Sequence, residues 1–491
     1  MKRLPLLALS ALLLAACGQS ASTEKNATKA EPAAAAAPPP PTQHFVSRPD
    51  LKPPPVRLLT GRRTAPGYVF LAPKMKVLQA GPMILDNRGH VVWFNPLDTH
   101  GVSDFRAQHY HGKPVLTWWR GKAPMGVGIG RYVIYDSTFH KIAEVRAGHG
   151  YAGDIHDFVI TRRNTGLFPI YHQVQVDLSS VGGPKDGRIF DGIFQEVNIK
   201  TGRVLFEWHS WPAVGLDVSY APAPKPPDPG KKAPPYDYFH LNSVELEPNG
   251  DYLISARNTH AVYRIDGKTG KILWRLGGKT SDFTMGPGTN FEWQHDARRH
   301  ENGTITIFDN GAAPPVEKFS RVLVLRANPQ TKRATLVRSY RHPKELLVPF
   351  EGNAQFLPDG HVFVGWGAVP YATEFDAAGR VVFDLNFGKG LAKITQPNQD
   401  ADSYRAYRFV WQGRPTGVPA AKIRGNKVFV SWNGATEVRS WRLIVDGTPA
   451  KTVPKTNFET ALTLSQGAKQ VAVVALDKSN RELARSKTIS P

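Results

Sequence analysis

Cysteine is nearly absent from this sequence, since Cys17 is the only one among 491 residues. A single thiol excludes an intramolecular disulfide and a zinc site built from several thiolates. Acidic residues are also scarce, with 41 Asp and Glu against 62 Lys and Arg and a formal net charge of +21. The basic residues are spread along the chain without dense runs, which disfavours a nucleic-acid partner and favours anionic small molecules or lipid headgroups.

Long apolar runs are lacking too, apart from Leu4 to Ala16, which follows Lys2-Arg3 and is too short to span a bilayer as a mature helix. The run ends in Leu14-Ala-Ala-Cys17, which resembles the lipobox of bacterial lipoproteins, where the cysteine is acylated. We therefore expect residues 1–17 to be a lipoprotein signal peptide and Cys17 to hold the protein at a membrane. Gly18 stands where an inner-membrane retention signal carries aspartate, so we expect the cell envelope, at the periplasmic face of the outer membrane.

Residues 18–55 are rich in Ala, Pro, Thr and Lys. Such a composition buries too little apolar surface to offset the entropy of ordering, so it predicts a semi-extended tether.

Helical periodicity is scarce in residues 56–413, where short β-type runs alternate with turns. One hairpin pattern places Asn-Gly or Asp-Gly between two apolar runs, as in 246–255, 299–308 and 356–365. A second hairpin type recurs at 197–208, 262–274 and 373–383. Four strands in each unit of about forty to fifty residues predict a β-propeller, and the length of the segment gives about six blades.

Two insertions interrupt this pattern, at 181–188 and 221–235, and the second precedes His240. Long loops of a propeller gather on one rim, so we expect this insertion to cover the channel. Residues 414–491 contain alternating strands in a different texture, which predicts a small immunoglobulin-like or fibronectin-like β-sandwich. The predicted fold class is therefore all-β, a six-bladed β-propeller followed by this sandwich.

Three histidines stand at similar points of the repeat, each before a run that leads into a turn: His156, His240 and His295. The innermost strands of a propeller line one channel, so these imidazoles are expected to converge. Arg257 follows Leu253-Ile-Ser-Ala on the next strand after His240. An arginine in such a run is costly to bury unless it meets an anion such as sulfate or phosphate, or forms a structural ion pair.

The sequence gives weaker support for a metal site or a dinucleotide site. Three histidines can bind a metal ion, but Arg257 beside them favours an anion. The sequence lacks HExxH and Cys/His clusters, and Gly126-Val-Gly-Ile-Gly130 lacks the spacing of a dinucleotide site. We expect no metal.

Several segments resemble the bacterial arylsulfate sulfotransferases, here in a lipoprotein form. They are Tyr238 to Val244, Leu253 to His260, Gln294 to Ala297 and Ile307 to Gly311, with 67–72 and 81–87 resembling the N-terminal part of the wider family. The resemblance implies a six-bladed propeller that moves sulfate from a phenolic sulfate ester to a phenolic acceptor through a sulfohistidine. It implies no cofactor and no adenylyl-sulfate donor.

By the same resemblance His295 is the nucleophile, and His240, Arg257 and His156 line the anion pocket. Asn242 and His260 are then substrate-binding residues. Aromatic residues in predicted rim loops are candidates to stack on the donor: Tyr151, Tyr236, Trp366 and Tyr371. The alternative is a non-catalytic envelope propeller that binds a glycan or a protein.

Overall fold

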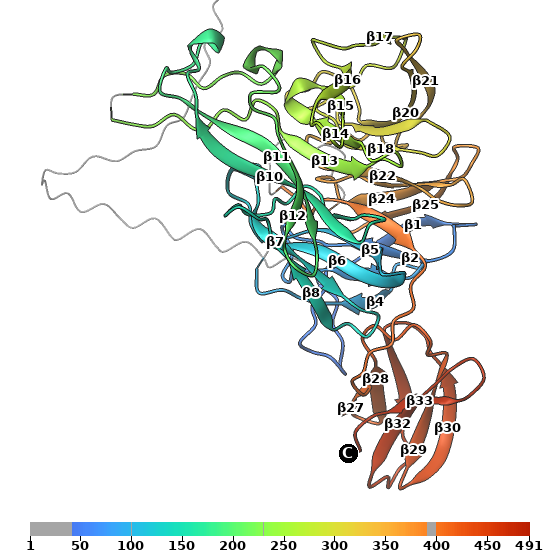
Figure 1. The fold of residues 1–491 in the computed structure, drawn as a ribbon. Helices are drawn as coiled ribbons and strands as arrows, with labels where there is room; N and C mark the ends of the chain where they lie inside the picture. The colour runs from blue at the N-terminus through green and yellow to red at the C-terminus, as the bar shows by residue number, and fades with distance from the viewer. Residues whose placement is uncertain (1–41, 100, 229, 390–398) are drawn as a thin grey trace, which may run out of the picture. The chain divides into compact units, whose positions relative to one another are not determined.

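The computed structural model describes residues 42–99, 101–228, 230–389 and 399–491. In these residues the regular structure is β-sheet, apart from four single-turn 3₁₀ helices (Figure 1). The expected all-β class is confirmed. None of the helices in the described residues has the length and apolarity needed to cross a bilayer. Cys17, the expected signal peptide and most of the expected tether lie outside the described residues.

Three sheets between residues 102 and 277 are antiparallel meanders of four consecutive strands. The first contains β5 (Val102–Tyr110), β6 (Lys113–Lys122), β7 (Ile129–Tyr135) and β8 (Lys141–Val145), with η1 (Pro124–Gly126) between β6 and β7. The second contains β9 (Val159–Ile160), β10 (Thr165–Gln175), β11 (Arg188–Asn198) and β12 (Val204–His209). The third contains β13 (Leu241–Leu246), β14 (Tyr252–Ala256), β15 (Ala261–Ile265) and β16 (Ile272–Gly277), with η4 (Arg257–Thr259) after β14.

A fourth sheet repeats the meander and gains a strand at its outer edge. It contains β18 (His295–Arg299), β19 (Ile305–Asp309), β20 (Arg321–Asn328) and β21 (Arg333–Tyr340), and β17 (Thr284–Met285) pairs in parallel with β21.

Two further sheets join the start of the body to its end. In one, β26 (Ala406–Phe409) pairs with β2 (Tyr68–Leu71), followed by β3 (Met83–Leu85) and β4 (Val91–Phe94). In the other, β1 (Arg57–Gly61) pairs with β25 (Val381–Asn386), next to β24 (Tyr371–Phe375), β23 (Val362–Gly365) and β22 (Asn353–Phe356). Main-chain hydrogen bonds between strands more than 300 residues apart therefore tie the two ends of the body together.

The predicted hairpins form because their turns meet a simple backbone demand. Gly250 has a φ of +98°, a conformation that side-chain-bearing residues avoid, and it lets Glu247 N–H donate to Asp251 O at 2.8 Å. The same hairpin pattern, with Asn-Gly or Asp-Gly in the turn, joins β18 to β19 and β22 to β23. The second hairpin type joins β11 to β12, β15 to β16 and β24 to β25. These hairpin predictions are confirmed.

The first strand of each of these six sheets contacts strands of the neighbouring sheets. These first strands are β5, β9, β13, β18, β22 and β26. β13 lies against β18, β18 against β22, β22 against β26, β26 against β5, and β5 against β9, while β10 lies against β13. Apolar clusters fill the spaces between adjacent sheets, for example around Phe194, Phe239 and Tyr252. Side chains that enter the space at the starts of these first strands therefore come from distant parts of the sequence.

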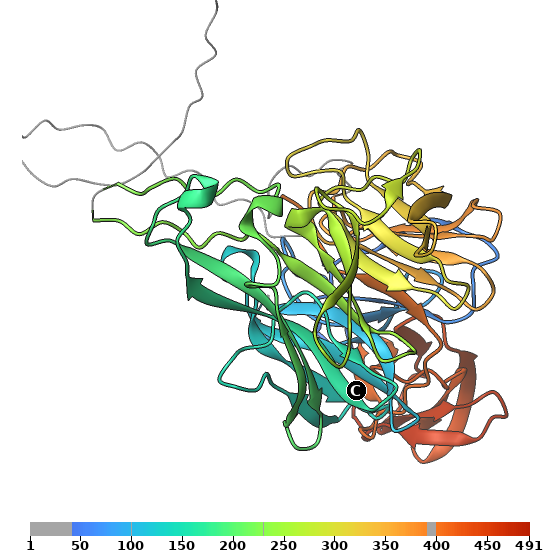
Figure 2. The same ribbon diagram turned by 45° about the horizontal axis from the view of Figure 1, so that its top comes forward.

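The insertion at 221–235 lies beside an extended hairpin. β10 and β11 pair over eleven residues each, far beyond their neighbour β9, and the hairpin projects past the other sheets in Figures 1 and 2, with η2 (Ser179–Val181) at its tip. Tyr236, after the insertion, exchanges backbone hydrogen bonds with Arg188 and Phe190 of β11. η3 (Leu216–Val218) and Tyr220 precede the insertion, and Tyr220 N–H donates to Asn258 O at 2.7 Å.

Residues 420–485 form two sheets with an apolar core between them. One contains β27 (Ala420–Arg424), β28 (Lys427–Ser431) and β31 (Glu459–Thr463); the other contains β29 (Ser440–Val445), β30 (Thr448–Pro454), β32 (Val471–Leu476) and β33 (Glu482–Arg485). Trp441, Leu443 and Val473 are among the core residues. Asn433 exchanges hydrogen bonds with the backbone of Phe94, at 3.0 and 2.9 Å, so this segment is attached to β4.

The end of the expected tether is packed rather than extended into solvent. Leu51 is only 1% exposed, and the ring of Phe45 lies 4.3 Å from that of Phe458. Ser47 N–H donates to Glu459 at 2.5 Å. The described residues of 42–55 thus pack against the folded part of the chain.

Candidate active site

The three predicted histidines come together although they are far apart in the sequence. His156 precedes β9, His240 precedes β13 and His295 begins β18. The ring centroids of His156 and His240 are 4.8 Å apart in an edge-to-face arrangement, and those of His240 and His295 are 6.5 Å apart. The cluster forms because each residue stands at the start of a first strand.

Two of these imidazoles are each paired with a carboxylate. His156 Nδ1 is hydrogen-bonded to Asp154, and His240 Nδ1 lies 2.5 Å from Asp237 Oδ2. Burial lowers the pKa of His240, and Asp237 only partly opposes that shift. Because Nδ1 is occupied in both rings, Nε2 is the nitrogen available to a ligand. The sequence reasoning missed both carboxylates, although an acid two or three residues before a histidine was a readable signal.

His295 has a neutral partner instead. Its Nδ1 lies 2.8 Å from Asn310 Oδ1, while Asn310 Nδ2 donates to Val348 O and Glu351 O, both at 3.0 Å. Those two carbonyls fix the amide with its oxygen toward the imidazole, so Nδ1 carries the proton. His295 Nε2 accepts a long hydrogen bond, 3.3 Å, from Glu351 N–H.

The electrostatics of this position favour a neutral His295. Burial lowers its pKa well below the usual value, and Arg257 lowers it further, while the hydrogen bond to Asn310 opposes the shift. The ring therefore holds an unprotonated Nε2 at neutral pH. An unprotonated nitrogen is what nucleophilic attack requires.

Glu351 itself is held by a buried ion pair. Lys74 Nζ lies 2.6 Å from Glu351 Oε1 and 3.2 Å from Asp402 Oδ2. All three side chains are less than a tenth exposed. This pairing holds the backbone that meets His295 Nε2.

Arg257, in η4, is a half-buried cation without a carboxylate partner. Its guanidinium lies 4.8 Å from the Trp293 ring and donates to Asn258 Oδ1 at 2.8 Å and Ala313 O at 3.3 Å. Among the described residues its guanidinium donates to no carboxylate, so the structural ion pair considered from the sequence is not formed there. Desolvation lowers its pKa to about 10, partly offset by Asp237, and the group stays charged at neutral pH. Such a cation suits an anionic ligand.

Asn242 and His260 lie at two different places. Asn242 Nδ2 donates to Gln294 O at 2.7 Å and so ties β13 to the residue before His295. His260 stacks on Tyr220 with centroids 4.0 Å apart and meets Trp293 edge-on at 4.4 Å. Burial, followed by Arg257, lowers the pKa of His260 to about 3. His260 therefore supports the ring beneath Arg257, and Asn242 supports the backbone at His295.

Irregular backbone sets the direction of these side chains. β13 is bulged between Leu241 and Ser243, and β18 between His295 and Arg298. His240, Asp296 and Glu351 have positive φ values of 57°, 53° and 69°. Bulges and left-handed residues redirect side chains at a sheet edge, and they cluster at functional sites.

Two tyrosines complete the wall of the histidine cluster, and neither was identified from the sequence. The Tyr171 ring lies 5.6 Å from His156 and 5.8 Å from His240, and its Oη donates to Leu241 O at 2.8 Å. The Tyr404 ring lies 5.6 Å from His156 and 6.4 Å from His295.

The aromatic residues suggested for donor stacking lie elsewhere. Tyr236, Trp366 and Tyr371 are at most 4% exposed and belong to the apolar clusters. Trp366 Nε1 donates to Thr373. That prediction is wrong for these three, because apolar packing rather than a ligand explains the large rings.

A buried ionic cluster lies along the same first strands. Asp157 accepts from Arg106 at 2.5 Å, Arg405 at 2.7 Å and Arg298 at 2.8 Å. Burial works to raise the pKa of Asp157, but the three guanidinium groups hold it well below the usual range. Asp296, the residue after His295, pairs with Arg298 at 2.8 Å and Arg405 at 3.3 Å, so its carboxylate belongs to this cluster.

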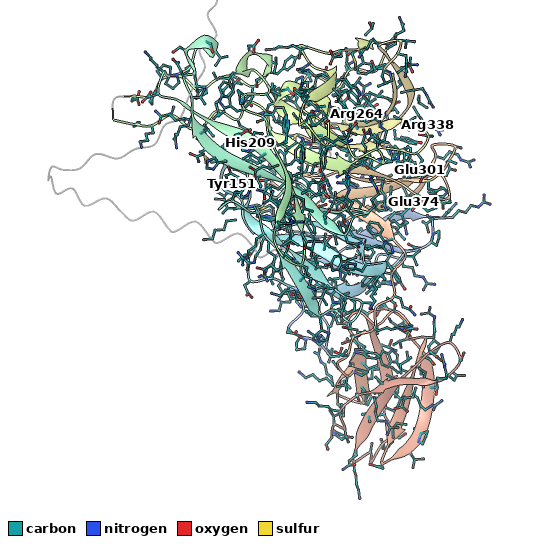
Figure 3. The ribbon with its side chains drawn as sticks, in the orientation of Figure 1. Tyr151, His209, Arg264, Glu301, Arg338 and Glu374 are labelled. Carbon is teal, nitrogen blue, oxygen red and sulfur yellow. The ribbon has the colours of Figure 1, made fainter. Side chains whose placement is uncertain are left out.

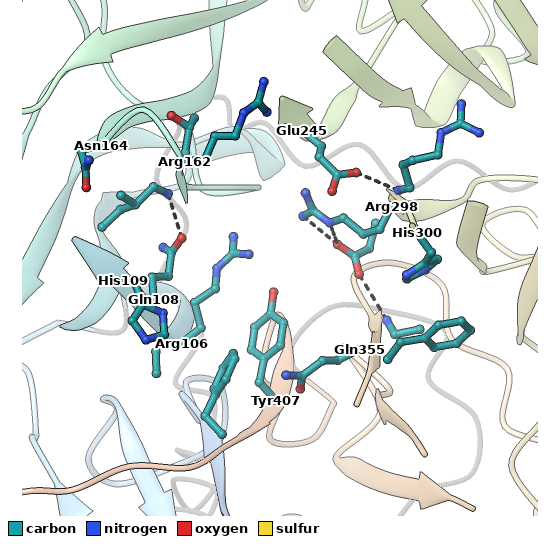
Figure 4. A pocket seen from close by; sticks show the side chains of 18 of the residues that line it. Arg106, Gln108, His109, Arg162, Asn164, Glu245, Arg298, His300, Gln355 and Tyr407 are labelled. Atoms are coloured by element: carbon teal, nitrogen blue, oxygen red, sulfur yellow. Dashed lines mark hydrogen bonds and ion pairs between the residues drawn. The ribbon is translucent and has the colours of Figure 1, made fainter. Parts of the chain in front are cut away.

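A cavity of about 610 Å³ opens beyond the ionic cluster, at the far ends of the first strands (Figure 4). It shares Arg106, Asp296 and Arg298 with the cluster. The other labelled side chains around it are Gln108, His109, Arg162, Asn164, Glu245, His300, Gln355 and Tyr407. No catalytic or substrate-binding residue expected from the sequence lines it, so the ionic cluster separates it from the histidines.

Metal ligation finds no geometric support in the described ranges, which contain no group of three His, Cys, Asp or Glu placed to hold an ion. The site instead combines a neutral imidazole, two carboxylate-paired imidazoles and an arginine without a carboxylate partner. Such groups suit an all-β enzyme that handles an anionic group.

A family model described as arylsulfotransferase (ASST) matches residues 106–388, more than half of the chain. The chain belongs to this family, as its motifs predicted. The match contains all three histidines of the cluster and Arg257, whereas Tyr404 lies outside it.

Likenesses to solved structures are weak. A Bacteroides caccae protein of unknown function has 13% identity and a TM-score of 0.40, covering 67% of this chain and 98% of its own. A streptogramin B lyase has 8% identity and a TM-score of 0.35, with 70% and 89% covered. A virginiamycin B lyase from Staphylococcus aureus has 9% identity and a TM-score of 0.26, with 88% and 98% covered. No curated protein matches the chain.

Proposed function

We propose that the protein transfers a sulfuryl group from a phenolic sulfate ester to a phenolic acceptor through a sulfohistidine at His295. Membership of the arylsulfotransferase family supports the reaction class. The observation that carries the proposal is the hydrogen bond between His295 Nδ1 and Asn310 Oδ1, which places the proton on Nδ1 and leaves Nε2 free of one.

In the first half-reaction, His295 Nε2 attacks sulfur while the bond from sulfur to the aryl oxygen breaks. The aryl oxygen leaves with the electron pair and takes a proton from Nε2 of a carboxylate-paired histidine, His240 or His156, which enters this step as the imidazolium. Arg257 stabilises negative charge on the sulfuryl oxygens. In the second half-reaction, the same imidazole accepts the proton of the acceptor phenol, whose oxygen attacks sulfur and breaks the bond to nitrogen.

The proposal includes the arrangement that creates the site. The six sheets of residues 57–409 are the blades of a propeller, and the ring of contacts among their first strands supports this arrangement. The two sheets of residues 420–485 form the sandwich. Lipid attachment through Cys17 places the enzyme at the periplasmic face of the outer membrane. Mass spectrometry of the purified protein tests that attachment, which an unmodified cysteine would contradict.

The decisive experiment compares the wild type with His295→Ala, using 4-nitrophenyl sulfate as donor and phenol as acceptor. The wild type is expected to release nitrophenol and form phenyl sulfate, and the variant to do neither. Donor without acceptor should leave a sulfo group on the His295 peptide, detected by mass spectrometry. Equal product from both proteins would contradict the proposal. No turnover by the wild type with any aryl sulfate would favour the alternative, a glycan-binding or protein-binding propeller.

A further inference from the structure

Tyr404 enters the histidine cluster from the last part of the body. The residue is 2% exposed, and its ring meets His156 edge-on, with an interplanar angle of 87°. Tyr404 O accepts from Gly352 N–H at 3.1 Å, next to Glu351, whose N–H donates to His295 Nε2. Tyr404 and His295 are therefore positioned by the same short stretch of backbone.

The hydroxyl of Tyr404 is buried and has no hydrogen-bond partner among the described residues. The other buried tyrosines show how unusual this is. Tyr132 donates to Asp154 O at 2.6 Å, Tyr252 to Glu196 at 2.5 Å, and Tyr263 to Thr259 at 2.9 Å. Buried hydroxyls are normally satisfied, and an exception calls for an explanation such as a catalytic role.

The charges around Tyr404 suit a neutral donor. Burial raises its pKa well above the usual value, while Arg405 opposes the shift, so the phenol keeps its proton throughout the working pH range. Arg405 lies 5.4 Å from the ring but directs its guanidinium to the ionic cluster, where it pairs with Asp157. The hydroxyl therefore remains available to a group held against His295.

We propose that Tyr404 Oη is a catalytic hydrogen-bond donor to a non-bridging oxygen of the sulfuryl group that His295 attacks. This inference rests on the proposed sulfotransfer. Its chemistry needs no bond change at Tyr404: the proton stays on the phenol, and the hydrogen bond strengthens as negative charge gathers on the oxygen. Proton transfer belongs to the carboxylate-paired imidazoles.

The test is Tyr404→Phe, which removes one oxygen and keeps the ring. Removal of one such donor typically costs about 10²- to 10³-fold in kcat. We expect that loss to be equal for 4-nitrophenyl sulfate and for phenyl sulfate, whose leaving group is more basic. For His240→Gln, in contrast, the loss should be larger with phenyl sulfate. A Tyr404→Phe loss that grows with leaving-group basicity would assign proton transfer to Tyr404 and overturn the inference.

Tyr252→Phe is the matched control, because it also removes a buried hydroxyl, but one that is bonded to Glu196. We expect Tyr252→Phe to lower the melting temperature and leave the rate unchanged. Tyr404→Phe should lower the rate and leave the melting temperature unchanged or raised. If Tyr404→Phe fails to fold, 3-fluorotyrosine at position 404 is the substitute, because it keeps the hydroxyl but makes it a stronger hydrogen-bond donor. An unchanged transfer rate with 3-fluorotyrosine would count against the inference.

Calorimetric binding of inorganic sulfate separates this inference from the proposed function. If Tyr404→Phe binds sulfate more weakly than the wild type, and the wild type transfers no sulfate, the contact is supported and the sulfotransfer is rejected. Wild-type binding and turnover by Tyr404→Phe would reject the contact and leave the sulfotransfer intact. Weaker binding together with a uniform loss of rate supports both.

Discussion

His295 differs from the other two clustered histidines in what holds its Nδ1 atom. Carboxylates hold His156 and His240, whereas the amide of Asn310 holds His295. Both acceptors favour the protonated ring, but a charged carboxylate does so more strongly than a neutral amide oxygen. In the proposed reaction, this difference separates the groups that would move protons from the group that would attack sulfur.

Asn310→Asp tests this distinction. The new carboxylate should raise the pKa of His295, which burial now holds well below the usual value. The neutral ring is lost as pH falls through that pKa, so the acid limb of the profile of kcat/KM should move to higher pH. Asn328→Asp is the control, because Asn328 accepts two backbone hydrogen bonds in an exposed turn, a role that a carboxylate fills equally well. Superimposable profiles for Asn310→Asp and the wild type would contradict the role of the amide.

Arg257 is the residue whose exchange should affect anion binding most. Arg257→Gln removes the charge, and we expect kcat/KM for aryl sulfates to fall by about 10²-fold or more. Arg257→Lys should restore only part of the loss, because an ammonium lacks the planar fork. Steady-state kinetics check both, with the exposed Arg203→Gln as control. Full activity in Arg257→Gln would remove arginine from the mechanism.

Residue types and spacing could indicate the histidines and Arg257, because their places in the repeat are visible in the sequence. They could not indicate Tyr404, since its neighbourhood depends on β26 folding back to β2. Asp154 and Asp237 were within reach, because each lies close to a histidine in the chain. Trp366 and Tyr371 were wrongly predicted to stack on the donor, because a large aromatic ring packs in an apolar core as readily as against a ligand.

At the scale of elements, the hairpins were predictable because a turn such as Asn249-Gly250 is a local demand. The bulges at the starts of β13 and β18 were not, since they arise where neighbouring sheets crowd the same space. Those bulges decide where His240 and His295 point.

β11 and β12 carry a pH-dependent contact away from the histidine cluster. His209, labelled in Figure 3, lies 2.6 Å from Asp191 and 3.1 Å from Glu207, and the hydrogen bond to Asp191 raises its pKa from 6.5 to about 9. Its stabilising contribution is full below the unfolded value and is lost as pH rises through about 9.

We therefore expect His209→Gln to lower the melting temperature clearly at pH 6 and little at pH 10. The effect should be modest, because the side chain is 38% exposed and water screens the pair. His109→Gln, at an exposed position with no carboxylate partner in the described ranges, should show no such trend. Equal shifts at both pH values would contradict the ion pairs.

At the scale of the molecule, the ionic cluster joins segments from the beginning, middle and end of the body. Asp157→Asn would leave three buried guanidinium groups short of one negative charge, and we expect it to cost about 3–5 kcal/mol of unfolding free energy. Denaturant unfolding measures this, with the exposed Asp228→Asn as control. A variant as stable as the wild type would show that the cluster is not needed for stability.

The pairing of β26 with β2 affects when the site is completed during synthesis and folding of the chain. Tyr404 and Arg405 immediately precede β26, so the wall of the histidine cluster is complete only after that late segment has been synthesised and has paired with β2. A growing chain holds His156, His240 and His295 long before it can use them. A polypeptide that ends before Tyr404 therefore contains all three histidines but lacks the tyrosine ring that lies against His156 and His295.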